Sequence, residues 1–514
     1  EFIEELIDNQ VLVSEIEPRV SGVDFLETII SILNKINANA EVEVLRSIQS
    51  MLEDLDKNIG NSVHKYFEIE KLIKSFNADY EQKYLFQTDL YKTDKPVLPS
   101  HWKKQLRQAI IFLNKLTGLS NNTYISTFKK AFSERFESEE VPLALALDTE
   151  IGIGYRQDNK AKGIHLYLED LQLPFSKQKQ NLTVHLTPIH YILNQKLQEA
   201  SVEKRYVIQL SDEDFNEFDE NWHDLPGTIS FMAEIISENH QEKLYIGNGG
   251  GSSAADLLGR FCSQKSEVQN LTQTIVQKEI ELNPDCILAE IVHLPEARIG
   301  NVIRRPTLRQ YEIPYLAQSV LPKENQIPID DLYISLRNDR IILRSKKLNK
   351  EIKPYLTNAH NYHNNSLPVY HFLSDLHSQN MRTGLYFDWG GLSQIYMFLP
   401  RVEYKNIILS KAQWKITEKD IASLEKLVNR KEEVLSSLKT WREKRQIPQW
   451  IQMVKSDNTI ALNLENYDMV KLFIQTVKIG KTVFIEEFLY NENDEFRHEF
   501  IFPVYKESGT LHKK

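Results

Sequence analysis

The stretch Leu244-Tyr-Ile-Gly-Asn-Gly-Gly-Gly-Ser-Ser-Ala-Ala-Asp-Leu-Leu-Gly-Arg-Phe-Cys262 contains four glycines within five residues. Its apolar start predicts a short strand over Leu244–Ile246, and the glycines predict a loop from Gly247 to Ser253. Because serine is a residue type that begins helices, Ser252 and Ser253 predict a helix that carries Arg260. We expect the other elements to be arranged around this strand, loop and helix.

This order of elements is compatible with an anion site in the loop. Loop amides and the free N–H groups of a following helix would point at the same place. The candidate binding residues are Gly249, Gly250, Gly251 and Ser252. The loop is not a Walker sequence, because no Gly-Lys-Ser/Thr follows, and it lacks the G-x-G-x-x-G pattern of a βαβ unit. A flexible surface turn is the alternative.

Composition excludes several classes of protein. The 514 residues are 41% hydrophobic and 26% charged, which are ordinary values for a globular protein of about two to four structural units. The net charge of -10 gives no overall attraction to nucleic acid, so such contact would need a local basic patch. Two cysteines, Cys262 and Cys286, indicate a reducing compartment without a disulfide framework. Neither a membrane span nor a signal peptide is visible, which predicts a cytoplasmic location.

The N-terminal part of the sequence is expected to be helical. Residues 1–20 predict a helix followed by a strand-like run over Leu12–Ile16, as at the end of a winged helix-turn-helix; a generic helix–strand pair is the alternative. Asp24 predicts the cap of a second helix, and apolar residues from Val44 to Ile59 predict a longer one. These two helices are expected to pack as a helical hairpin. Since the chain begins inside a predicted helix without an initiator Met, we expect a piece of a longer protein.

An acidic residue lies within the next apolar run. Tyr84–Leu90 is rich in strand-forming residues and carries Asp89 in its middle, where an acid either faces solvent or is held in a site. A basic, amphipathic helical region is expected from Trp102 to Phe136, and a short apolar helix over Pro142–Asp148. Residues 156–183 predict an exposed excursion.

The remaining elements predict an α+β protein of several subdomains, with mixed sheets and helical hairpins. The strongest strand signals are Thr228–Ile236 and Cys286–Leu294, and Asn338-Asp339 predicts the turn of a hairpin formed by Asp331–Leu336 and Arg340–Arg344. Residues 346–353 predict a polar basic segment, Pro368–Leu376 a helix that docks on the preceding sheet, and residues 418–443 one charged helix. The expected units are residues 1–20, 21–155, 156–416 and 417–514.

Two clusters suggest ligand contacts. The arginines Arg298, Arg304, Arg305 and Arg309 lie within twelve residues of an acidic chain, so they are candidates for phosphate or carboxylate contact. A charged surface loop is the alternative. The histidines His360, His363 and His371 have no fixed metal-ligand spacing and no neighbouring cysteine, so no metal is predicted.

The order of short motifs along the chain resembles a known family. The motifs are Thr88–Leu90, Phe128–Phe136, Val141–Leu143, Asp148–Gly154, Gly259–Phe261, Ala289–Glu296, Asn301–Val302, Asp331–Ile334, Leu399–Arg401 and Leu409–Lys415. Together they resemble the large N-terminal region of class I lantibiotic (lanthipeptide) dehydratases, the family of the nisin dehydratase. Each motif is short, and the signal is their shared order over nearly the whole chain.

The resemblance implies a two-step dehydration of a ribosomal precursor peptide. Glutamyl-tRNA would serve as co-substrate, without a bound cofactor, to glutamylate Ser or Thr. A C-terminal domain would then eliminate glutamate to leave dehydroalanine or dehydrobutyrine. This sequence of steps is chemically reasonable, because a carboxylate ester leaves far more readily than a hydroxyl once a base removes the α-hydrogen.

Two residues match functional positions of the family. The resemblance implies that Arg260 serves glutamylation by pairing with a glutamyl carboxylate or a tRNA phosphate, and that Asp89 serves elimination. The family's further glutamylation residues and its eliminating domain have no counterpart here. We therefore expect a central-core fragment of a larger enzyme, inactive by itself, in which residues 1–20 are the tail of a winged-helix element that binds leader peptides.

The resemblance also implies partners, and two other functions are alternatives to the one it implies. The implied partners are the precursor peptide, glutamyl-tRNA, the missing N-terminal and C-terminal domains, a cyclase and a second copy in a homodimer, in the cytoplasm or peripherally at the inner membrane. One rival is a non-catalytic scaffold that binds peptide or tRNA for partner enzymes. Another is an unrelated phosphate-ester enzyme that uses the glycine loop.

Overall fold

The structure is a computed structural model of the 514-residue chain. It describes residues 2–8, 12–90, 97–119, 123–156, 183–238, 241–262, 266–296, 299–363, 366–455, 458–490 and 497–507.

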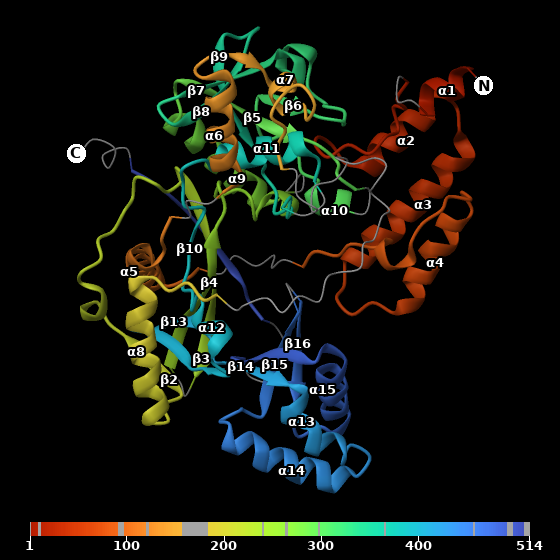
Figure 1. Cartoon of the computed structure of the whole chain (residues 1–514). Coiled ribbons are helices and arrows are strands. Elements are labelled where there is room, and N and C mark those ends of the chain that lie inside the picture. The colour runs from red at the N-terminus through yellow and green to blue at the C-terminus, as the bar shows by residue number, and fades with distance from the viewer. Residues whose placement is uncertain are drawn as a thin grey trace.

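Three sheets organise this described part of the chain, as Figure 1 shows. The six-stranded upper sheet has the order β1 (Val141–Pro142), β7 (Leu332–Arg337), β8 (Arg340–Ser345), β9 (Lys350–Tyr355), β5 (Cys286–Val292), β6 (Tyr311–Pro314). The seven-stranded central sheet has the order β18 (Phe500–Tyr505), β3 (Thr228–Glu238), β4 (Gln241–Gly250), β13 (Ile407–Ser410), β12 (Arg401–Tyr404), β2 (Val207–Leu210), and β10 (Gly384–Leu385) also pairs with β4. The five-stranded lower sheet has the order β11 (Phe398–Leu399), β14 (Gln413–Thr417), β17 (Thr482–Glu487), β15 (Trp450–Lys455), β16 (Asn458–Asn463).

Helices cover each sheet and supply its core. The upper sheet shares a core with α6 (Tyr124–Phe136), α7 (Leu143–Leu147) and α11 (Pro368–His377). The central sheet packs on α5 (Ser100–Leu116), α8 (Pro188–Val202) and α12 (Leu392–Ile395), and the lower sheet on α13 (Glu418–Glu425), α14 (Lys431–Lys444) and α15 (Tyr467–Gly480). The remaining helices are α1 (Phe2–Asp8), α2 (Phe25–Lys35), α3 (Asn39–Asp56), α4 (Val63–Lys74), α9 (Glu267–Leu282) and α10 (Gly300–Ile303). The predicted α+β fold with mixed sheets is confirmed, since β5 pairs in parallel with β6 and β9 whereas β7 and β8 are antiparallel.

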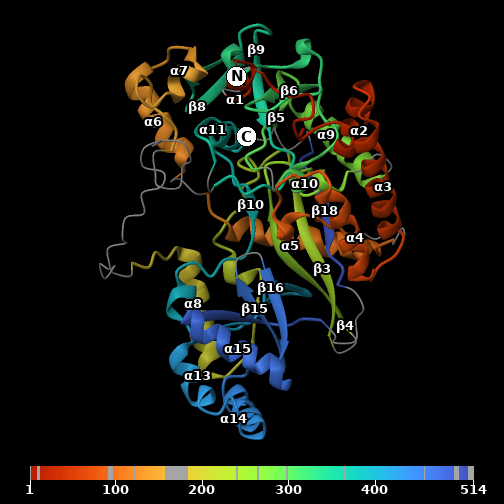
Figure 2. The same cartoon turned by 90° about the vertical axis from the view of Figure 1, so that its right-hand side faces the viewer.

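Several local predictions are confirmed by their physical signals. Asp24 caps α2 by accepting from the amides of Leu26 and Glu27. Helices α2 and α3 pack as the predicted hairpin, and α4 adds to it at the edge of the molecule (Figure 2). Asn338 and Asp339 both have positive φ, as a two-residue hairpin turn requires, and they join β7 to β8. Helix α11 packs on β9, as expected for Pro368–Leu376.

Other local predictions are wrong. No strand forms over Leu12–Ile16 or Tyr84–Leu90, and the charged region 418–443 is divided into α13 and α14. Winged-helix and leader-binding roles for residues 1–20 stay predictions, as do the four domain boundaries. Most of the expected excursion, residues 157–182, lies outside the described residues. Among the residues described, no helix has the length and apolar character needed to cross a membrane.

The glycine-rich stretch differs from its prediction in two ways. Strand β4 does not end at Ile246 but continues through the glycines to Gly250, since β3 pairs on one side and β10 pairs with Gly249 and Gly250. A Cβ atom at Gly249 would lie 2.1 Å from the Phe231 ring, so the close packing of this ring against strand β4 requires glycine at residue 249. The predicted helix is also absent, because Arg260 lies on a single 3₁₀ turn, Gly259–Phe261, and α9 begins only at Glu267.

Candidate functional site

The structure brings Arg260 and Asp89 into direct contact. A guanidinium nitrogen of Arg260 (Nη2) forms a hydrogen-bonded ion pair with Oδ1 of Asp89, and each side chain is 27% exposed. Gln87 donates a further, weak hydrogen bond of 3.4 Å to the same carboxylate oxygen. The Asp89 carboxylate is therefore partly buried and forms an ion pair. The resemblance links its partner, Arg260, to glutamylation, whereas it links Asp89 to elimination.

The backbone at Arg260 packs against a group of buried polar residues that we call the buried platform. Its members are Glu279, Glu290, Arg305, Arg309 and Thr357. A Cβ atom at Gly259 would lie 2.3 Å from the carbonyl oxygen of Thr357, so the two segments approach closely only because residue 259 is glycine. Thr357 is held in turn by Glu290, which accepts hydrogen bonds of 2.7 Å from both its amide and its hydroxyl. The position of Arg260 thus depends on a charge buried in strand β5.

Two of the predicted ligand-binding arginines belong to this platform. Arg305 donates to Glu290 at 2.6 Å and 3.1 Å, and Arg309 donates to Glu290 at 3.2 Å and to Glu279 at 2.6 Å. All four side chains are at most 3% exposed. Burial would raise the pKa of Glu290, but the two guanidinium groups and Thr357 hold it below its usual value. Arg305 and Arg309 are therefore occupied by protein carboxylates.

The other two arginines of the cluster have different surroundings. Arg304 is partly exposed and pairs with Asp24 at 3.1 Å, which joins the N-terminal helices to the upper part of the molecule. Arg298 lies outside the described residues. That these arginines contact a phosphate or carboxylate ligand stays a prediction. Arg304 is the better candidate, because its side chain is partly exposed whereas Arg305 and Arg309 are buried.

The amides after the glycines already bind a carboxyl group of the protein itself. The amides of Ser252 and Ser253 donate to Oδ2 of Asp256 at 3.1 Å and 3.2 Å, and the Gly251 amide donates to the Thr383 carbonyl. Burial, reinforced by the charge of Glu279, raises the pKa of the Asp256 carboxyl well above its usual value. An external anion at these amides would have to displace Asp256.

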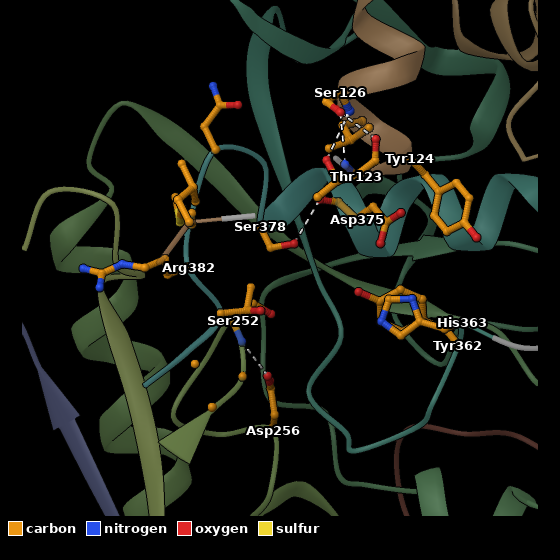
Figure 3. Close-up of a pocket in the computed structure, with 18 of the residues that line it drawn as sticks. Thr123, Tyr124, Ser126, Ser252, Asp256, Tyr362, His363, Asp375, Ser378 and Arg382 are labelled. Atoms are coloured by element: carbon orange, nitrogen blue, oxygen red, sulfur yellow. Dashed lines mark hydrogen bonds between the residues drawn. The ribbon is translucent and has the colours of Figure 1, made fainter. Parts of the chain in front are cut away.

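A cavity of about 1310 Å³ lies between the upper and central sheets. Its floor includes Gly250–Ser252 and Asp256, and its opposite wall includes Thr123 at the start of α6 (Figure 3). Figure 3 also shows Asp375 and Ser378 from the α11 side, with Tyr362 and His363 across from them. The lining combines hydroxyl, amide and tyrosine groups with apolar side chains around a space large enough for a peptide segment. Arg260 does not line this cavity, although it follows directly on the segment that does.

Two of the three histidines gather beside the cavity with an acid. Ligand atoms of His363, His371 and Asp375 lie within 4.8 Å of one another. However, Arg156 approaches Nδ1 of His371 at 2.8 Å, and because arginine only donates, this nitrogen must accept. The Nε2–H group of His371 then faces Asp375 at 3.2 Å. The guanidinium of Arg156 therefore lies where it repels a second cation at Nδ1 of His371, which favours a polar network over a metal cluster.

His377 links the glycine stretch to α11. Its Nε2 lies 2.7 Å from the Ser252 carbonyl, so this nitrogen carries the proton, and burial lowers the pKa of His377 to about 4. A histidine held neutral in the fold contributes stability above its unfolded pKa of about 6.5 and loses it as the pH falls toward 4.

We expect acid to destabilise the protein through His377. Between pH 6.5 and pH 4 the contribution is at most about 3 kcal/mol, and His377→Gln, which keeps a donor for Ser252, should flatten this part of the profile. The measurement is the urea midpoint at several pH values. His64→Gln on α4, where the side chain is 77% exposed, is the control. Equal profiles for the wild type and His377→Gln would contradict the assignment.

Sequence reasoning missed the residues that build the platform. Glu279, Glu290 and Thr357 were not singled out, and Asp256 was quoted only as part of the glycine stretch. Glu290 did carry a signal, because it is the one acid inside the most apolar strand of the sequence, Cys286–Leu294. A charge in such a strand requires a buried partner. The two arginines that supply it follow within twenty residues.

Comparison with known proteins agrees with this fold. The family model for the N terminus of lantibiotic dehydratases matches residues 1–473. The subtilin biosynthesis protein SpaB of Bacillus subtilis is 23% identical over 93% of this chain and 46% of its own length. The nisin biosynthesis protein NisB of Lactococcus lactis subsp. lactis is 23% identical over 96% of this chain and 48% of its own. The crystal structure of the tRNA-dependent lantibiotic dehydratase MibB from Microbispora sp. 107891 superposes with a TM-score of 0.76 at 18% identity, covering 98% of this chain and 50% of MibB.

The mixed α+β fold of three sheets, with a partly exposed arginine above the buried platform, is thus similar to the fold of half of a lantibiotic dehydratase. The chain belongs to the lantibiotic dehydratase family, and it corresponds to the family's N-terminal region. It spans about half the length of the relatives that it matches.

Proposed function

We propose that this chain is the glutamylation core of an enzyme that dehydrates Ser and Thr in a ribosomal precursor peptide. The match of residues 1–473 to the family model carries the proposal. The fold shared with MibB, a tRNA-dependent lantibiotic dehydratase, supports glutamyl-tRNA as the donor. A non-catalytic scaffold that binds peptide or tRNA is the alternative outcome of the test below.

The proposed chemistry has two steps. The Ser or Thr hydroxyl attacks the carbonyl carbon of the glutamyl ester, and the 3′ end of the tRNA leaves as an alcohol. A base then removes the α-hydrogen of the modified residue, and glutamate leaves as a carboxylate. We propose that Arg260 binds the glutamyl group in the first step, that Asp89 serves the second, and that the cavity beside Gly250–Ser252 holds the peptide. Elimination further requires groups from the half of the relatives that this chain does not cover.

The test is a reconstituted reaction with the protein that carries this chain. A precursor peptide encoded beside it is incubated with glutamate, ATP, glutamyl-tRNA synthetase and tRNA-Glu. Mass spectrometry should detect loss of water only when all components are present. Dehydration without tRNA would contradict the proposed donor, and binding of tRNA or peptide without any transfer would favour the scaffold.

A further inference from the structure

The contact between Asp89 and Arg260 carries an inference about how the two chemical steps are linked. It rests on the proposed function. We infer that Arg260 is a carboxylate-binding site, that Asp89 occupies it in the unloaded protein, and that the carboxylate of an incoming glutamyl group displaces Asp89.

Arg260 is paired less completely than Arg382 and Arg401, two arginines that hold segments of this protein together. Arg382 and Arg401, both nearly buried, donate to carboxylates and carbonyls through every guanidinium nitrogen. Within the described part of the chain, Arg260 forms its hydrogen bond with Asp89, and its Nε is buried without a partner. Because the Arg260 side chain is 27% exposed and forms its ion pair with one carboxylate, its guanidinium is suited to bind another carboxylate in place of Asp89.

The two partners are fixed to different degrees. Arg260 follows Gly259, which is packed against Thr357 above the Glu290 platform. Asp89 lies in residues 85–90, which form neither helix nor strand after the 3₁₀ turn Gln82–Tyr84. This segment is attached to helix α4 through Phe86, whose ring contacts Tyr66. Asp89 is therefore the partner that moves away when the pair opens.

The exchange requires little free energy. Partly exposed ion pairs are weak, and this one is joined by one hydrogen bond from the arginine. A glutamyl group brings a carboxylate of the same chemistry, so the charge on Arg260 stays neutralised throughout. Once released, Asp89 has no cationic partner on Arg260 and lies beside the substrate that Arg260 holds. Loading of the donor thereby frees the carboxylate that the second step uses.

Asp89→Asn tests this arrangement because asparagine keeps the shape of the side chain and removes its charge. We expect the KM for glutamyl-tRNA to fall by up to about fivefold with kcat for glutamylation unchanged, and glutamylated peptide to accumulate. Glu81→Gln makes the same charge change just before the 3₁₀ turn Gln82–Tyr84, at a residue paired with Lys83, and should leave both constants unaltered. A rise in KM, or loss of glutamylation in Asp89→Asn, would overturn the inference, since Asp89 would then position Arg260 rather than compete for it.

A binding measurement separates this inference from the proposed function. Glutarate, a dicarboxylate probe, should bind Asp89→Asn more tightly than the wild type, and should not bind the double variant Asp89→Asn/Arg260→Gln. If the wild type glutamylates peptide but the three proteins bind glutarate equally, the exchange is wrong and the function stands. If Asp89→Asn binds glutarate more tightly but no protein transfers glutamate, the function is wrong and the exchange stands.

Discussion

Replacing Glu290 by glutamine is expected to lower the free energy of unfolding by about 3–5 kcal/mol. Glu290 and Glu279 balance Arg305 and Arg309, and all four groups are nearly inaccessible to water. Removing one carboxylate leaves a buried guanidinium charge without compensation, and Thr357 loses its anionic acceptor. Because Thr357 fixes Gly259, the variant should also reduce activity that depends on Arg260.

The measurement is the denaturant midpoint of the transition that includes the upper sheet. The control is Glu433→Gln, which breaks the exposed pair of Glu433 with Arg430 on α14 and should cost less than about 1 kcal/mol. If Glu290→Gln were no less stable than Glu433→Gln, the Glu290 carboxylate would not be needed to compensate the buried charges of Arg305 and Arg309.

The second large effect is expected at Arg260. Arg260→Lys keeps the positive charge but loses the planar pair of donors, and glutamylation should fall by at least about 100-fold while the protein stays folded. Arg340→Lys is the matched control, because Arg340 is also a partly exposed arginine that pairs with one carboxylate, Glu351. Rates come from single-turnover transfer with preformed glutamyl-tRNA. If Arg260→Lys transferred glutamate at the wild-type rate, Arg260 would have no role in binding the donor.

Local signals in the sequence were sufficient for much of the fold. Asn338-Asp339 predicted its hairpin because positive φ is a property of the turn residues themselves. Asp24 predicted its helix because a cap acts within three residues. Such features are decided by neighbours in the chain, and a single sequence contains them.

Structural features that depend on residues far apart in the sequence could not be predicted from local signals. The glycines at 249 and 250 read as a loop, yet they lie in a strand because Gly384 and Leu385 pair with them from far along the chain. Asp89 and Arg260 are separated by 171 residues, and no spacing rule predicts their contact. The arginine cluster was assigned to ligands because the sequence does not show that Glu279 and Glu290 lie beneath it.

The transfer of isotope-labelled glutamate from glutamyl-tRNA to the precursor peptide is the most direct measurement of the central claim. With the protein that carries this chain, we predict peptide-dependent consumption of labelled glutamyl-tRNA, with the label recovered on Ser or Thr of the peptide or as free glutamate beside dehydrated peptide, for the wild type but not for Arg260→Lys. Neither labelled nor dehydrated peptide with the folded wild-type protein, or equal transfer by both proteins, would contradict the account.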